Sequence, residues 1–258
     1  MAGFRDFLKS GHTPTLFAAF FYLMFSFVIW VMNGAMAPFI SEQFQLTPAQ
    51  KGLLLSIPIV AGAIMRFPLG LLAQYVGRKT ATLVELCLIT FTMSFGYFFV
   101  HTYDDLLKMA LLLGVAGASF GVAMSLGSGW YPPKYKGLAM GLVGAGNAGT
   151  ALAALLAPPL AQAYGWQTVY GIAAIASLVP MAVVLFMAKE PPDRDEHASM
   201  REHLACLLEK DGWVFSLIYV VTFGGFIGIV TFLPTYYYDQ FGVSKVQAGQ
   251  LTMLAALM

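Results

Sequence analysis

One basic side chain stands inside a run that is otherwise apolar. Arg66 lies within the segment 56–73, SIPIVAGAIMRFPLGLLA, of a helix that we predict to reach from 52 to 76. A helix of that length crosses a bilayer, and Arg66 falls close to its middle. A charge at that depth costs at least about 3 kcal/mol on insertion scales, so such residues usually serve a function. The natural partner of this guanidinium is an anion, and the alternative is a structural arginine paired with backbone carbonyls.

The composition predicts an all-α polytopic membrane protein. The chain is 59% hydrophobic and 10% charged, whereas a soluble domain carries about 25% charged residues. The net charge of +1 leaves no basic face for nucleic acid. Neither a nucleophile–base set nor a His/Cys/Asp/Glu cluster is recognisable, so we predict neither an enzyme nor a metal or cofactor site.

The apolar runs divide the chain into about seven membrane-spanning helices and a truncated eighth. The expected spans are 16–40, 52–76, 80–100, 106–126, 137–161, 169–188 and 214–237, followed by a short run from 248 to 258. This pattern predicts a six-helix bundle over 1–188, a charged linker over 189–212 and the start of a second bundle over 213–258. The last run is too short to cross a bilayer, so we expect the chain to be the N-terminal part of a longer protein. A re-entrant or interfacial ending is the alternative.

The basic residues predict which side of the membrane each loop occupies. With a cytoplasmic N-terminus, the cytoplasmic segments hold Arg5, Lys9, Arg78, Lys79, Lys134, Lys136, Lys189, Arg194, Arg201 and Lys210, and the opposite side holds Lys51, Lys108 and Lys245. Because basic residues concentrate in cytoplasmic loops, this bias places the N-terminus and the linker in the cytoplasm.

The loop after the second span carries a recognisable motif. The segment 70–79, GLLAQYVGRK, resembles the G-x-x-x-D-x-x-G-R-K/R loop of the major facilitator superfamily, and six helices before a charged loop fit the same family. Gln74 stands where the motif has an aspartate, which removes one charge from the pairing that the family uses. The resemblance implies a transporter fold of two helical bundles.

A narrower resemblance rests on the fifth span. The segment 141–149, GLVGAGNAG, is similar to the glycine-rich signature of the nitrate/nitrite porter family, and Arg66 matches an arginine of that family's second span. Further similar segments are FVIW at 27–30, GVAGASF at 114–120 and YVVTFGGFIG at 219–228. The resemblance implies a secondary transporter that moves nitrate and/or nitrite by alternating access across the cytoplasmic membrane of a bacterium, for nitrate assimilation.

The same resemblance implies a set of substrate-binding residues. They are Arg66, Asn147, Tyr219, Phe223, Phe120, Phe27 and Gly144. A guanidinium can donate two parallel hydrogen bonds to a planar anion, and aromatic ring edges carry positive partial charge. Each residue also has a structural interpretation, because small residues at helical spacing usually pack helices, an asparagine can bridge helices, and most phenylalanines face lipid or core.

Two alternative functions and one coupling question stay open at this stage. The chain could belong to a facilitator for another small or organic anion, or to a non-transporting membrane sensor. Protons are a possible coupling ion, because proton symport also occurs in the family. Glu85, the other charge within a span, is expected either to make a structural pair near the cytoplasmic interface or to relay protons.

Overall fold

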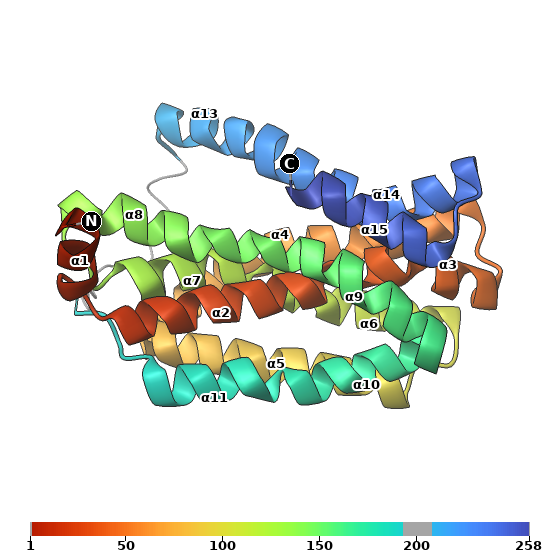
Figure 1. Cartoon of the computed structure of the whole chain (residues 1–258), viewed down its shortest axis with the longest axis horizontal. Helices are drawn as coiled ribbons and strands as arrows, with labels where there is room; N and C mark the ends of the chain where they lie inside the picture. Colours follow the sequence, from red (N-terminus) through yellow and green to blue (C-terminus); the bar gives the residue numbers. More distant parts are fainter. Residues whose placement is uncertain (1, 193–207, 258) are drawn as a thin grey trace.

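The computed structural model describes residues 2–192 and 208–257, and every element within them is a helix. Long helices run side by side along the longest axis of the molecule (Figure 1). Within the described residues, the segments long and apolar enough to cross a membrane are Thr13–Phe44, Pro48–Val76, Arg78–Phe98, Tyr103–Ser128, Pro133–Tyr164, Trp166–Met187 and Lys210–Phe241. These seven segments confirm the predicted all-α membrane fold, and most extend a few residues beyond the predicted ends. Residues 193–207 of the predicted linker lie outside the described residues.

Most spans are built from more than one helix. α4 (Pro48–Val76) and α5 (Arg78–Phe98) are uninterrupted. Before the linker, the broken spans are α2 (Thr13–Trp30) with α3 (Met32–Phe44), α6 (Tyr103–Gly117) with α7 (Ser119–Ser128), α8 (Pro133–Gly144) with η1 (Ala145–Ala148) and α9 (Gly149–Tyr164), and α10 (Trp166–Ala176) with α11 (Leu178–Met187). A short helix, α1 (Ala2–Lys9), precedes them. Such breaks tilt one half of a span relative to the other and free backbone carbonyls inside the bundle.

α2 forms the centre of the first bundle. Its side chains Tyr22, Leu23 and Phe27 are fully buried, and α7, α9 and α11 pack around it. The glycine-rich segment allows one of these approaches, because a Cβ on Gly149 would lie 2.1 Å from the Met24 carbonyl oxygen. Gly146 and Gly149 therefore act in helix packing, as small residues commonly do in membranes, whereas a Cβ on Gly137 or Gly141 would meet nothing within 4 Å.

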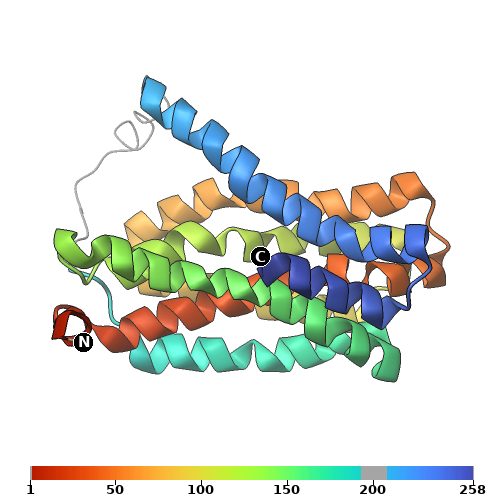
Figure 2. The same ribbon diagram turned by 45° about the horizontal axis from the view of Figure 1, so that its top comes forward.

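The chain after the linker forms three connected helices and a final one. α13 (Lys210–Tyr219) continues through the π-helix η3 (Val220–Gly224) into α14 (Gly225–Phe241), and α15 (Lys245–Leu257) turns back. α14 packs against α3, and α15 packs against α9. α13 slopes away from the first bundle toward the linker end (Figure 2), and none of its residues is buried. The later helices thus contact the first bundle mainly at the end opposite the linker.

The loop motif is held by a carboxylate from a distant position. Gly77, with φ of 92°, ends α4 and begins α5. The backbone N–H groups of Arg78 and Lys79 donate to Glu190 at 2.7 and 2.9 Å. Since free N–H groups at a helix start favour an anion, Glu190 stabilises the start of α5. The negative charge at this loop comes from the residue after the sixth span rather than from position 74.

Glu85 has a buried partner, although the partner is not a cation. The carboxylate is fully buried within α5, and it accepts a hydrogen bond from the Tyr22 hydroxyl of α2. This contact joins the third span to the first and agrees with a structural pairing.

Candidate functional site

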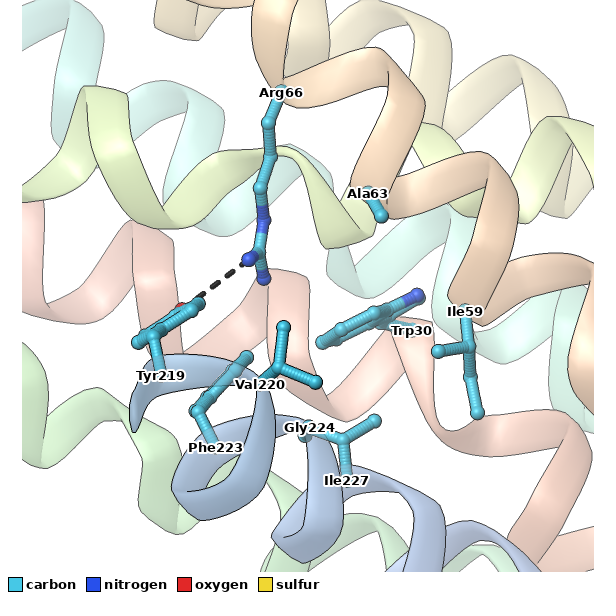
Figure 3. A pocket seen from close by; sticks show the side chains of 9 residues that line it. All are labelled: Trp30, Ile59, Ala63, Arg66, Tyr219, Val220, Phe223, Gly224 and Ile227. Atoms are coloured by element: carbon cyan, nitrogen blue, oxygen red, sulfur yellow. Dashed lines mark hydrogen bonds between the residues drawn. The ribbon is translucent and has the colours of Figure 1, made fainter. Parts of the chain in front are cut away.

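Arg66 reaches from α4 toward the helix that follows the linker. Its Nε donates to the Gly117 carbonyl oxygen at 3.1 Å, at the break between α6 and α7. Its Nη1 donates to the Tyr219 hydroxyl at 3.2 Å (Figure 3). Because Gly117 lies in the fourth span and Tyr219 in the seventh, the guanidinium connects the spans before the linker with the span after it.

Aromatic rings surround the guanidinium. Its Cζ atom lies 5.2 Å from the ring centre of Phe223, 5.6 Å from Tyr219, 5.8 Å from Trp30 and 6.0 Å from Phe120. A cation over aromatic faces is attracted by about 0.5–2 kcal/mol per favourable ring, most strongly where water is excluded. These rings offset part of the desolvation of Arg66 without neutralising its charge, so the guanidinium still attracts an anion.

A small cavity opens beside these groups. Its volume is about 160 Å³, and it is lined by Trp30, Ile59, Ala63, Arg66, Tyr219, Val220, Phe223, Gly224 and Ile227. Arg66 supplies the charge and Tyr219 a hydroxyl, while none of these lining residues carries a carboxylate. The cavity has room for a small ion, and its one guanidinium and one hydroxyl are fewer hydrogen-bonding groups than a sugar needs. The arrangement fits a small monovalent anion.

The π-helix η3 places two of the aromatic residues. Tyr219 ends α13 and Phe223 lies within η3, and their rings stack with centres 4.9 Å apart at 15°. π-turns are rare and occur often at functional sites, because the wider turn shifts the side chains of one helix face. Gly224 and Gly225 follow directly, and Gly224 lines the cavity. The wide turn presents Tyr219 and Phe223 together toward Arg66.

The structure brings some of the predicted residues together at the cavity. Arg66, Tyr219 and Phe223 line it. Phe27 and Phe120 do not line it but lie behind it, with ring centres 6.0 and 5.5 Å from that of Phe223. Phe27 is fully buried, so in this conformation it supports the other rings rather than facing the cavity.

Gly144 and Asn147 are not among the residues that line this cavity. A Cβ on Gly144 would approach the Met124 side chain at 3.1 Å. Asn147 lies in η1, and its Oδ1 is buried without a hydrogen-bond partner among the described residues. Their participation in anion binding stays a prediction.

Several lining residues were not singled out from the sequence. They are Trp30, Ile59, Ala63, Val220, Gly224 and Ile227. Helical spacing could have found some of them, because residues 59, 63 and 66 follow one another at intervals of four and three and therefore share a face of α4. The same rule relates 220, 223, 224 and 227 around η3. Trp30 has no comparable signal.

These features define a helical transporter fold, and the chain belongs to the Major Facilitator Superfamily, whose sequence profile matches residues 16–258. The chain is 33% identical to a probable nitrate transporter, NarT, of Staphylococcus haemolyticus over 230 residues, covering 88% of this chain and 59% of that protein. It is 28% identical to the nitrite extrusion protein of Bacillus subtilis over 232 residues, covering 89% and 58%. It is 33% identical to a probable nitrate/nitrite antiporter, NarK1, of Thermus thermophilus over 251 residues, covering 91% and 55%. The expected similarity to nitrate and nitrite transporters is confirmed, and the chain spans 55–59% of the length of these relatives.

Solved structures support the fold. A bacterial homologue of the human lysosomal transporter Spinster, crystallised inward-facing and occupied, superposes with a TM-score of 0.71 at 20% identity, covering 94% of this chain and 58% of that one. The inward-facing, unoccupied form gives a TM-score of 0.73 at 22% identity, covering 95% and 60%. At this identity the likeness concerns the fold alone, and it agrees with a multi-pass membrane transporter of the superfamily type.

Proposed function

We propose that this chain forms the first bundle and part of the second bundle of a secondary transporter for nitrate and/or nitrite. The observation that carries the proposal is the Arg66 guanidinium, bound to Tyr219 and surrounded by aromatic rings beside a cavity of about 160 Å³. The nitrate and nitrite transporters among its relatives support the choice of substrate.

The chemistry of the cavity matches these anions. Nitrate and nitrite are planar, monovalent and weakly hydrated, and the guanidinium is a planar donor that keeps its charge at every physiological pH. Arg66 can turn hydrogen-bond donors toward two anion oxygens, and Tyr219 can add a third through its hydroxyl. Because no carboxylate lines the cavity, the local charge selects anions.

The position of the site between the halves supports alternating access. Arg66 belongs to the first bundle and Tyr219 to the helices after the linker, so an anion bound there contacts both. In transporters of two related bundles, rocking of one bundle against the other exposes a central site to each side in turn. With a cytoplasmic N-terminus and linker, the end where α13 slopes away faces the cytoplasm of a bacterium.

A fixed positive charge also bears on coupling and direction. When no anion is bound, the charge of Arg66 is not neutralised inside the low-dielectric membrane. The empty transporter therefore changes its facing direction less readily than the transporter with a bound anion. This favours exchange of one anion for another. Transport coupled to protons, with net uptake of nitrate for assimilation, is the alternative within the same proposed function.

The test replaces the planar donor while keeping its charge. Arg66→Lys in the whole gene product should reduce labelled nitrate and nitrite flux into proteoliposomes by about 100-fold, because an ammonium offers a point charge without the paired donors. Arg5→Lys, outside the spans, is the matched control and should keep full flux. Unchanged flux in the Arg66→Lys protein, with normal folding, would contradict the site. Flux of an organic anion in place of nitrate would favour the alternative facilitator, and anion binding without flux would favour a sensor.

A further inference from the structure

Trp30 joins three parts of the first bundle at the cavity. It is the last residue of α2, and only 4% of it is exposed. Its indole Nε1 donates to the Pro58 carbonyl oxygen of α4 at 2.9 Å. This bond fixes the plane of the indole relative to α4, the helix that carries Arg66.

Two glycines make room for the indole. A Cβ on Gly117 would lie 2.4 Å from the Trp30 ring, and a Cβ on Gly62 would lie 3.1 Å from its Nε1. Distances under 3.0 Å to a rigid ring require the ring or a helix to move. The carbonyl oxygen of Gly117 is also the acceptor for Arg66 Nε at 3.1 Å. The backbone of one glycine therefore contacts both the indole and the guanidinium.

The indole faces the aromatic wall of the second bundle across the site. Trp30 and Phe223 rings lie nearly parallel, at 20°, with centres 6.4 Å apart, and both line the cavity. Phe27 packs edge-on against Trp30 from behind, with centres 5.4 Å apart at 78°. Trp30 thus contacts Pro58, Phe27 and the two glycines, and it lines the cavity together with Phe223 (Figure 3).

We propose that Trp30 is a positioning and specificity-determining residue of the anion site. It holds Gly117 against α4, so that the Gly117 carbonyl oxygen can orient the Arg66 guanidinium, and its ring limits the space available to an anion. This inference rests on the proposed transport of nitrate or nitrite. It predicts that removing the indole N–H weakens substrate binding and relaxes selectivity for small anions while the fold persists.

The experiment compares two buried tryptophans of the first bundle. Trp30→Phe removes the bond to Pro58 but keeps an aromatic ring, and Trp166→Phe is the matched control. Trp166 is also 4% exposed, and its Nε1 donates to Gln43 Oε1 at 2.6 Å, away from the cavity lining. The readouts are KM and kcat for nitrate uptake by the whole gene product in proteoliposomes, with acetate and benzoate as larger competing carboxylates.

We expect Trp30→Phe to raise KM for nitrate about five- to tenfold, with a smaller change in kcat, and to strengthen inhibition by benzoate relative to wild type. Trp166→Phe should leave KM and the inhibition pattern unchanged. Equal effects of both variants on KM would show a general packing role and would overturn the proposal, as would an unchanged KM and selectivity in Trp30→Phe.

A second pair of variants reaches the indole without changing it. Gly117→Ala places a methyl group 2.4 Å from the Trp30 ring, whereas Gly96→Ala places one 3.1 Å from the buried ring of Tyr170. Gly117→Ala should reproduce the KM and selectivity changes, and Gly96→Ala should not. If wild type and Trp166→Phe carry no nitrate, the proposed function fails. If they carry it and Arg66→Lys does not, but Trp30→Phe behaves as wild type, only the inference about Trp30 fails.

Discussion

The two ends of the molecule are held together differently. At the end opposite the linker, ion pairs cross between the first bundle and the later helices: Lys51 contacts Asp239 at 2.8 Å, and Lys245 contacts Glu42. The first bundle supplies the cation, Lys51, to one pair and the anion, Glu42, to the other. Close backbone approaches accompany these pairs, because a Cβ on Gly34 would lie 2.6 Å from the Thr231 carbonyl oxygen.

At the linker end, the polar contacts that the structure describes join parts of the first bundle. The Lys189 N–H donates to Thr15 Oγ1 at 2.8 Å, and the Trp130 indole donates to the Lys189 carbonyl oxygen at 3.2 Å. Glu190 binds the start of α5. Meanwhile α13 buries none of its residues, although Trp213, Phe215 and Leu217 on it are apolar and more than half exposed.

The two ends therefore affect two different free energies: that of folding the first bundle, and that of the conformational change between the parts before and after the linker. Contacts at the linker end stabilise the first bundle itself, whereas contacts at the opposite end stabilise one arrangement of the two halves. Arg66 and Tyr219 lie between these ends, so a shift of the halves at one end changes the surroundings of the anion site. Changes at the two ends should accordingly have separable effects on conformation and on folding.

The largest effect is expected from the glycines at the end opposite the linker, where the helices before and after the linker contact each other; we call this the closed end. Gly34→Ala and Gly249→Ala add methyl groups 2.6 and 2.4 Å from backbone oxygens of Thr231 and Ala154. Overpacking of this kind costs about 1–3 kcal/mol, so the ratio of closed to open molecules should fall about 5- to 160-fold in each variant. Double electron–electron resonance between spin labels at 49 and 240 measures the separation of the halves. Gly228→Ala, with nothing within 4 Å of its Cβ, is the matched control, and a distance shift as large in this control would refute the prediction.

Reversing one ion pair should have a smaller effect. Asp239→Lys places a second positive charge beside Lys51, while the double variant Lys51→Asp with Asp239→Lys restores attraction. Exposed pairs contribute roughly 0.2–1 kcal/mol each, so the single reversal should lower the closed population about two- to fivefold and the swap should recover most of it. The same labels report the change, which 1 M salt should weaken. A swap no better than the single reversal would mean that the pair contributes nothing.

The smallest conformational effect is expected from the linker end. Glu190→Ala removes the carboxylate that accepts from two backbone N–H groups. Loss of a helix cap costs about 1 kcal/mol, so the midpoint of thermal unfolding should fall. The distance between the labels at 49 and 240 should stay as in wild type. Glu42→Ala should show the opposite pattern: the distance between the labels should change, and the midpoint of thermal unfolding should fall little. If both variants gave the same pattern, the two ends would not differ in the way proposed here.

The sequence predicted the fold well because hydropathy and helix length act locally. Seven spans and their order follow from apolar runs that must satisfy their backbone hydrogen bonds internally. The ends of the spans were placed a few residues short, because helices such as α4 continue through polar caps beyond the apolar run. The break at Val31 and the π-turn after Tyr219 were not predicted, since neither changes hydropathy.

A residue of the site could be predicted from the sequence when its type is rare within a membrane span. Arg66 is conspicuous because a charge within an apolar span is rare. Tyr219 and Phe223 came from a family resemblance. Trp30 lies in the family-like segment 27–30, but only Phe27 of that segment was predicted to bind the substrate. The pairs at the closed end could not be predicted, because Lys51 and Asp239 are 188 positions apart and only the fold brings them together.

The π-turn at Val220–Gly224 has a consequence for how the chain tolerates length changes. A π-turn holds one residue more than the α-turn it replaces, so it marks a place where the residue count and the helix register disagree. Deleting one residue from this segment would leave the hydropathy of the span nearly unchanged and would let a regular helix form. Because the deletion turns the π-turn into an α-turn, the residues before and after it would keep nearly the same register, whereas the same deletion within α14 would rotate one part of the helix against the other by about 100°. A one-residue gap in this segment would therefore change the local spacing of the side chains beside the cavity, among them Tyr219 and Phe223, without turning the rest of the span.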